Sequence, residues 1–91
     1  MKAETIGRDL HDENPEIRRA AASACAFKEI KRFVPQLIEL LSDRERGVAR
    51  TAYEVLKDLT GQDFGPARDA DEAARKQAIA TWLKWWQTKS E

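Results

Sequence analysis

The amino-acid sequence predicts an all-α domain in which short helices stack in antiparallel pairs. Apolar residues recur at helical spacing in about four segments, with a shorter segment before them. Asparagine, proline and glycine stand where these segments begin and end. The stretches that start at Asp12 and Asp43 also resemble each other, which is typical of repeated helix pairs.

The first part of the chain is expected to hold a short helix and a longer one. Ile6 and Leu10 share a face within residues 2–11. Asn14 fits an N-cap, and Pro15 fits the first helical position, where its missing N–H costs nothing. The longer helix is therefore predicted for 15–27. Its expected buried stripe is made mostly of small residues: Ile17, Ala21, Ala24, Cys25 and Phe27.

The next helix is predicted from about Arg32 to Leu41. Pro35 must lie in its first turn, because deeper in a helix a proline removes a hydrogen bond and clashes with the preceding turn. The expected buried stripe is Val34, Leu37, Ile38 and Leu41. The opposite face carries Arg32, Gln36, Glu39 and Leu40.

A further helix is predicted for residues 43–59. Ser42 and Glu45 have capping-box spacing at its start, and Gly61 is a good terminator. Its expected buried stripe is Val48, Ala52, Val55, Leu56 and Leu59.

Residues 61–70 have the composition of a loop, with two glycines, a proline and two aspartates. Phe64 is the only large apolar side chain there, and we expect it to pack back on the core. Asp69 and Glu72 offer a second capping box for the helix that follows.

The last helix is predicted for residues 70–88 and is rich in tryptophan. Trp82 and Trp86 fall on one apolar stripe with Ile79 and Leu83, so both are expected in the core. Trp85 lies on the flank of that stripe, where core packing and partner docking both remain open.

The internal similarity carries a resemblance to a known family. When Asp12 is set on Asp43, Ile17 falls on Val48 and Ala21 on Ala52. The segments FVPQLIELLSD (33–43) and DENPEIRRAAASAC (12–25) resemble HEAT repeats, in particular those of bacterial HEAT-like proteins. The ending, with its Gly-Gln-Asp-Phe-Gly loop and Trp-rich segment, is similar to that of some of these proteins.

The resemblance implies a short α-solenoid and a scaffold that binds other proteins, without any chemistry of its own. It implies that Arg18 reaches toward the turn at Asp12. Ala49 stands where the family has the equivalent arginine, so the second unit departs from the pattern.

The organisation expected from this register is one domain over residues 1–91. Residues 1–11 are a capping or half-repeat helix, 12–42 are the first repeat, and 43–91 are the second repeat with its long loop and closing helix. The Trp-rich helix would be the C-terminal cap, which terminal repeat units need in order to cover their apolar faces.

Composition excludes several classes of function. The sixteen basic and sixteen acidic residues cancel, so no overall field attracts nucleic acid or an anionic membrane. No apolar run approaches the length of a membrane span, and the first ten residues lack the apolar stretch of a signal peptide. A lone cysteine forms no intrachain disulfide. These features predict a cytoplasmic protein.

The residues that carry chemistry in other proteins form no recognisable constellation here. His11 is the single histidine and is expected at the surface near a turn, and Cys25 is expected to be a small buried thiol. Asp63 is expected to hydrogen-bond the backbone of its loop, since one carboxylate is not a metal site. No cofactor and no metal are therefore expected, and an enzymatic function is the less favoured hypothesis.

The function predicted first is a non-catalytic protein-interaction module or the terminal cap of a HEAT-like scaffold. Its partner surface would be the exposed side of the 32–41 helix, with Leu40 as an apolar anchor and Arg32, Gln36 and Glu39 as a polar rim; Trp85 is a further candidate. One alternative is an enzyme-accessory protein like the HEAT-like bilin lyase subunits. The other is a nucleic-acid-binding HEAT module, which the small basic excess in residues 16–50 disfavours.

Overall fold

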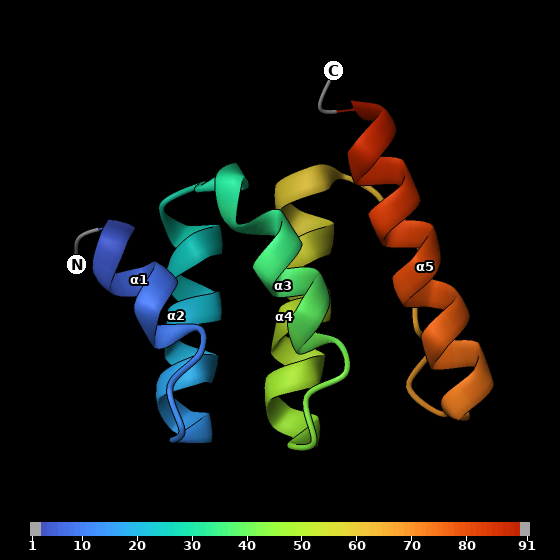
Figure 1. Ribbon diagram of the computed structural model, residues 1–91, viewed down its shortest axis with the longest axis horizontal. Coiled ribbons are helices and arrows are strands. Elements are labelled where there is room, and N and C mark those ends of the chain that lie inside the picture. Colours follow the sequence, from blue (N-terminus) through green and yellow to red (C-terminus); the bar gives the residue numbers. More distant parts are fainter. Residues whose placement is uncertain (1–2, 90–91) are drawn as a thin grey trace.

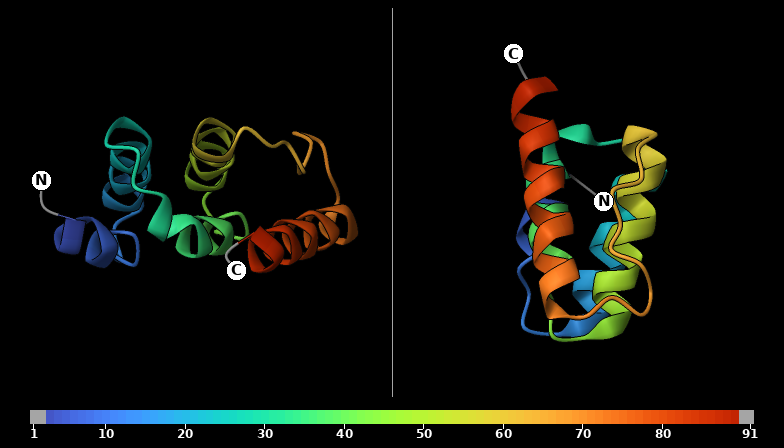
Figure 2. Two further views of the ribbon diagram at one scale, coloured as in Figure 1. Left: turned by 90° about the horizontal axis from the view of Figure 1, so that it is seen from above. Right: turned by 90° about the vertical axis from the view of Figure 1, so that its right-hand side faces the viewer.

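The computed structural model describes residues 3–89, which form helices arranged in two layers (Figures 1 and 2). One layer holds α2 (Pro15–Phe27) and α4 (Arg46–Thr60). The other holds α1 (Ala3–Asp9), α3 (Val34–Leu40) and α5 (Glu72–Lys89), with a single 3₁₀ turn, Lys31–Phe33, just before α3. The described part of the chain contains no strand. The predicted all-α class and stacked helix arrangement are confirmed.

The last helix runs in an unexpected direction. α2 and α3 are antiparallel, as a repeat of this kind requires, and α4 again runs opposite to α3 (Figure 1). The loop after α4 then descends the whole height of the molecule, so that α5 starts at the same end as α4 and runs parallel to it. The N-terminal ends of α2, α4 and α5 therefore lie at one end of the molecule.

The core lies between the two layers and repeats from one unit to the next. Ile6 and Leu10 of the N-terminal segment are fully buried, as are Leu37 and Leu41 at the equivalent positions around α3. α1 therefore lies in the second layer, at the position that α3 has in the following unit. The remaining large side chains that are almost completely buried are Val34, Ile38, Val48, Leu56 and Trp82.

α2 and α5 start with a single asparagine or aspartate cap rather than a capping box. Asn14 caps α2 as predicted, accepting a hydrogen bond of 2.9 Å from the amide of Glu16. The capping box predicted at Ser42 is wrong, because that hydroxyl donates back to a carbonyl in the last turn of α3 while Asp43 accepts from the amide of Glu45. The box predicted at Asp69 is also wrong.

Asp71 caps α5 instead, and its carboxylate accepts from the amide of Ala74 at 2.8 Å. Gly61 ends α4 in the left-handed conformation (φ 71°), as its position predicted.

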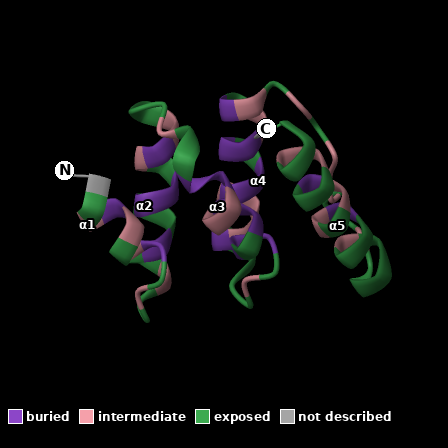
Figure 3. Cartoon of the chain, turned by 45° about the horizontal axis from the view of Figure 1, so that its top comes forward, coloured by how far each residue is buried: buried purple, intermediate pink, exposed green. Residues whose placement is uncertain are grey.

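Two of the predicted buried positions on α2 are in fact exposed. Ile17 is 37% exposed and Phe27 is 89% exposed, although Val48, the counterpart of Ile17 on α4, is 1% exposed. The difference follows from position in the stack. α4 has α2 beside it in the same layer, whereas no further described helix of that layer lies on the other side of α2 (Figures 2 and 3).

The opposite error concerns Leu40, which was expected to be an exposed anchor and is only 7% exposed. α3 lies in the second layer between α1 and α5 and packs on α4, so little of its surface is left to solvent (Figure 2). On α5, the predicted stripe holds for Trp82, which is fully buried, but Leu83 is 39% exposed.

Candidate functional site: an arginine-lined groove at the end of the arginine–aspartate link

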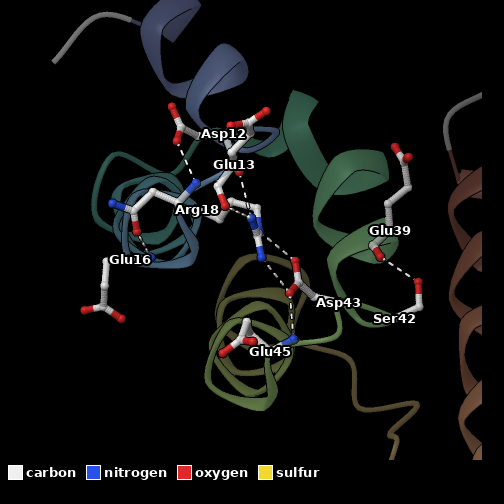
Figure 4. Close-up of polar contacts among 9 residues, drawn as sticks. Asp12, Glu13, Glu16, Arg18, Glu39, Ser42, Asp43 and Glu45 are labelled. Atoms are coloured by element: carbon white, nitrogen blue, oxygen red, sulfur yellow. Dashed lines mark hydrogen bonds and ion pairs between the residues drawn. The ribbon is translucent and has the colours of Figure 1, made fainter.

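The two repeats are joined by a buried ion pair between Arg18 and Asp43 (Figure 4). Nε of Arg18 donates to Oδ2 of Asp43 at 2.8 Å, and Nη2 donates to Oδ1 at 2.9 Å. The third nitrogen, Nη1, donates to the carbonyls of Asp12 and Glu13. Arg18 thus reaches the turn at Asp12 as predicted, and it also binds the corresponding turn of the next repeat.

The pair shifts the ionisation of both partners. Burial opposes the charge on Asp43 and is the largest single influence on it. The hydrogen bonds from Arg18 and from the amide of Glu45, together with the positive charges of Arg18 and Arg44, outweigh burial, so the pKa of that carboxyl lies below its usual range. The hydrogen bond with Asp43 raises the pKa of Arg18. Both groups therefore stay ionised over the physiological range.

This ion pair predicts a loss of stability in acid. A carboxyl whose pKa is lower in the folded than in the unfolded chain stabilises the fold above its unfolded pKa, about 4, and this contribution disappears as the pH falls through the folded value. We expect the thermal unfolding midpoint to be flat from pH 7 to pH 5 and to fall below about pH 4. In the Asp43→Asn variant the acid-induced fall should be smaller; an equal fall in both proteins would contradict the assignment.

The second repeat lacks the residue that would continue this link. Ala49 occupies the position of Arg18, and it lies in a groove of about 510 Å³ between the start of α4 and the segment 66–75. Gly47, Pro66 and Ala67 contribute further small surfaces to this groove. Its wide polar wall consists mainly of arginines: Arg44, Arg46, Arg50, Arg68 and Arg75.

The charges of this arginine-lined groove are poorly compensated. Asp43 is the only carboxylate among its lining residues, and it is already held by Arg18. Arg50 pairs with Glu54 at 3.2 Å, whereas no ion pair within residues 3–89 involves any of the other four groove arginines. The N-termini of α4 and α5, which carry partial positive charge, lie at this same end of the molecule (Figure 1).

A tyrosine–aspartate contact fixes the loop that forms one wall of the groove. The hydroxyl of Tyr53 on α4 donates to Asp63 at 2.8 Å, and the amide of Gly65 donates to the same oxygen. These two bonds lower the pKa of Asp63. Arg50 and Lys57 lie over the Tyr53 ring, 5.0 and 4.7 Å from its centre. The prediction that Asp63 hydrogen-bonds its own loop is confirmed.

The residues predicted as a partner surface do not gather at one place. Gln36, Glu39 and the buried Leu40 line a separate hollow of about 410 Å³ beside the Arg18–Asp43 pair. Within the described chain, Oε1 of Gln36 is buried and accepts no hydrogen bond. Arg32 is exposed, lies over the ring of Phe33, and does not line this hollow.

Trp85 belongs to an aromatic cluster that also contains Phe64, Trp82 and Trp86. Its ring centre lies 5.9 Å from Phe64 and 6.3 Å from each of the two tryptophans. Phe64 meets Trp82 edge to face at 4.9 Å, which confirms that this loop residue packs back on the core. Trp86 was expected in the core and Trp85 on its flank, but both side chains are partly buried. The expected difference in burial between these two tryptophans is therefore not observed.

Groups with nucleophilic or metal-binding chemistry are isolated. Cys25 is fully buried, as predicted, and burial raises the pKa of its thiol to about 11, so the thiol is neutral at physiological pH. His11 is exposed after α1, also as predicted. Residues 3–89 bring together no three metal-ligating side chains of the His, Cys, Asp and Glu types. None of the described helices is both long and apolar enough to cross a bilayer.

The stacked helices, and the ion pair that joins Arg18 of one unit to Asp43 at the start of the next, define a helical repeat protein of the solenoid class. The family model for HEAT repeats matches residues 6–67, which is more than half of the chain. The chain therefore belongs to the HEAT repeat family, whose members are protein-interaction or scaffold modules. No curated protein and no solved structure matches it.

The groove arginines were not predicted as a site. Arg44, Arg46 and Arg50 lie within seven residues, and that density was the available signal. Arg68 and Arg75 join them only because the loop descends and α5 starts beside α4.

Proposed function

We propose that the protein is a non-catalytic interaction module whose arginine-lined groove binds an acidic segment of a partner protein. The observation that carries this proposal is the groove itself, in which five arginines are accompanied by one carboxylate that is already paired. A carboxylate accepts two parallel hydrogen bonds from one guanidinium, so Asp and Glu side chains suit such a wall better than a neutral ligand does.

The shape of the groove supports a peptide as the ligand. Gly47, Ala49 and Ala67 leave room for a backbone to approach the floor, and a volume of about 510 Å³ accommodates a few side chains. A nucleic acid would need an extended basic track for its phosphates, whereas this chain has no net charge and the five groove arginines cover only a short distance. An acidic peptide is therefore the favoured ligand, and the experiment below also measures binding of a nucleic acid.

The bilin-handling alternative finds little support in the aromatic end of the molecule. Phe64 lines a third hollow of about 460 Å³ together with small residues, and Asp69 is its only charged lining residue. A bilin carries propionate carboxylates, which an aspartate would repel, and no lysine or arginine lines this hollow to bind them.

If the groove is the binding site, the affinity for an acidic peptide should depend on its arginines, for example Arg46 and Arg75. A fluorescent peptide of alternating Asp and Glu, titrated by anisotropy, should bind the native chain more weakly as salt rises. Arg46→Glu combined with Arg75→Glu should lower the affinity about tenfold, because two partly screened ion pairs contribute about 0.7 kcal/mol each.

The matched control is Arg8→Glu combined with Lys28→Glu, which makes the same charge change at exposed sites that do not line the groove. It should bind nearly as well as the native chain. If both double variants lost the same affinity for the peptide, the binding would depend only on net charge, and the proposal would be overturned. Tighter binding of a single-stranded oligothymidine than of the peptide would favour the nucleic-acid alternative.

A further inference from the structure

The interface between the two repeats has a polar and an apolar part. The polar part is the Arg18–Asp43 pair. The apolar part is the side of α4 turned toward α2: a Cβ built on Gly47 would lie 3.7 Å from Cδ of Arg19, and Val48 and Val55 on the same side are 1% and 4% exposed. Thr51 lies between these two valines on the helix surface.

The same set of positions recurs on the free side of α2. Ile17, Ala20 and Ala24 are the repeat equivalents of Val48, Thr51 and Val55. Ile17 is 37% exposed, Ala20 is exposed and Ala24 is only partly buried. Phe27, the most exposed large apolar residue described, continues this stripe at the end of the helix.

The acidic acceptor of the interface recurs as well. Asp12 is the repeat equivalent of Asp43, and both are held by the same local bond: Oδ1 of Asp12 accepts from the amide of Asn14 at 2.8 Å, and Oδ1 of Asp43 accepts from the amide of Glu45 at 2.9 Å (Figure 4). Asp43 has its arginine, whereas no described residue forms an ion pair with Asp12.

We propose that this free side of α2 is a docking surface for the first helix of another HEAT-like repeat, one that carries an arginine at the position of Arg18. Its guanidinium would bind the carboxylate of Asp12, and the small residues of that helix would cover Ile17, Ala20 and Ala24. The occupant is assigned by continuity, because the surface extends the α2–α4 interface by one unit. This inference does not rest on the arginine-lined groove.

A second copy of the chain is a poorer occupant. The only helix face that it would offer in this geometry is the far side of α4. That side has Ala49 in place of the arginine, and the loop after α4 is tied across it by the Tyr53–Asp63 bond.

The test inserts a second copy of residues 12–42 between residues 11 and 12 of the full chain. The inserted unit brings its own arginine to the original Asp12 and its own small-residue helix to the original Ile17. We expect the thermal unfolding midpoint to rise. Asp12→Asn at the original position should then lower the midpoint of the extended chain by about 3–6 °C. In the native chain it should have almost no effect, since asparagine keeps the oxygen that binds Asn14.

Ala20→Glu provides an independent readout of the apolar part. Ala20 is exposed in the native chain, so the variant should be tolerated there and should destabilise the extended chain. Equal effects of either substitution in both chains, or an inserted unit that adds no helical circular dichroism, would overturn the proposal. Sedimentation of the native chain as a dimer that Ala20→Glu dissociates would assign the surface to a second copy instead.

Discussion

Trp82→Ala is expected to leave the protein barely folded. Trp82 is the only large side chain of α5 that is fully buried, and its Nε1 donates to the carbonyl of Gly65 at 2.7 Å. Truncating a tryptophan in a core costs about 3–5 kcal/mol, and a domain of this length has only about 5–10 kcal/mol in total. Chemical denaturation followed by circular dichroism should show most of the stability lost.

Neighbouring positions provide the controls. Leu83→Ala removes a side chain that is 39% exposed and should cost well under 1 kcal/mol. Trp85→Ala should fall between the two, because Trp85 is partly buried and contacts three aromatic rings. A Trp82→Ala protein with nearly native stability would show that α5 is not part of the cooperative fold.

Asp43→Ala should be the next most damaging change. The side chains of Arg18 and Asp43 are 10% and 8% exposed, so removing the carboxylate leaves a buried guanidinium without its anion. Such a loss costs about 3 kcal/mol when the remaining charge is held away from water. The same substitution also removes the acceptor for the amide of Glu45 at the start of α4.

Asp12→Ala is the matched control for Asp43→Ala. It deletes an equivalent carboxylate with the same local amide bond, but that carboxylate has no ion pair in the described chain. The difference between the two variants in denaturant midpoint therefore isolates the arginine–aspartate link. Equal costs for the two variants would mean that the link between repeats contributes nothing measurable.

The helices and their register could be predicted because their causes are local. Asn14, Pro15 and Gly61 mark helix ends through their own backbone chemistry, and the apolar spacing of residues 34–41 identifies the buried face of one helix. Burial at the edge of the stack could not be predicted in this way. Ile17 and Val48 have the same local pattern, and only the presence or absence of a neighbouring helix decides their exposure.

The direction of α5 and the groove were also beyond local reasoning. Nothing in residues 61–70 states whether the chain returns at once or first descends alongside α4, because that choice depends on Tyr53 holding Asp63 and on Trp82 holding Gly65. The arginine-lined groove depends on that choice. Its arginines come from segments that meet only when α4 and α5 start at the same end.

Because of Ala49, the two ends of the helix stack do not match each other. The link between units requires a guanidinium from the earlier unit and a carboxylate from the later one, and Ala49 provides no guanidinium to a unit that follows. Copies of this chain are therefore not expected to add end to end into an open helical polymer, the risk that repeated head-to-tail contacts bring. One alanine in place of arginine thus removes the link to a further unit, while the helix that carries it, α4, keeps its regular form.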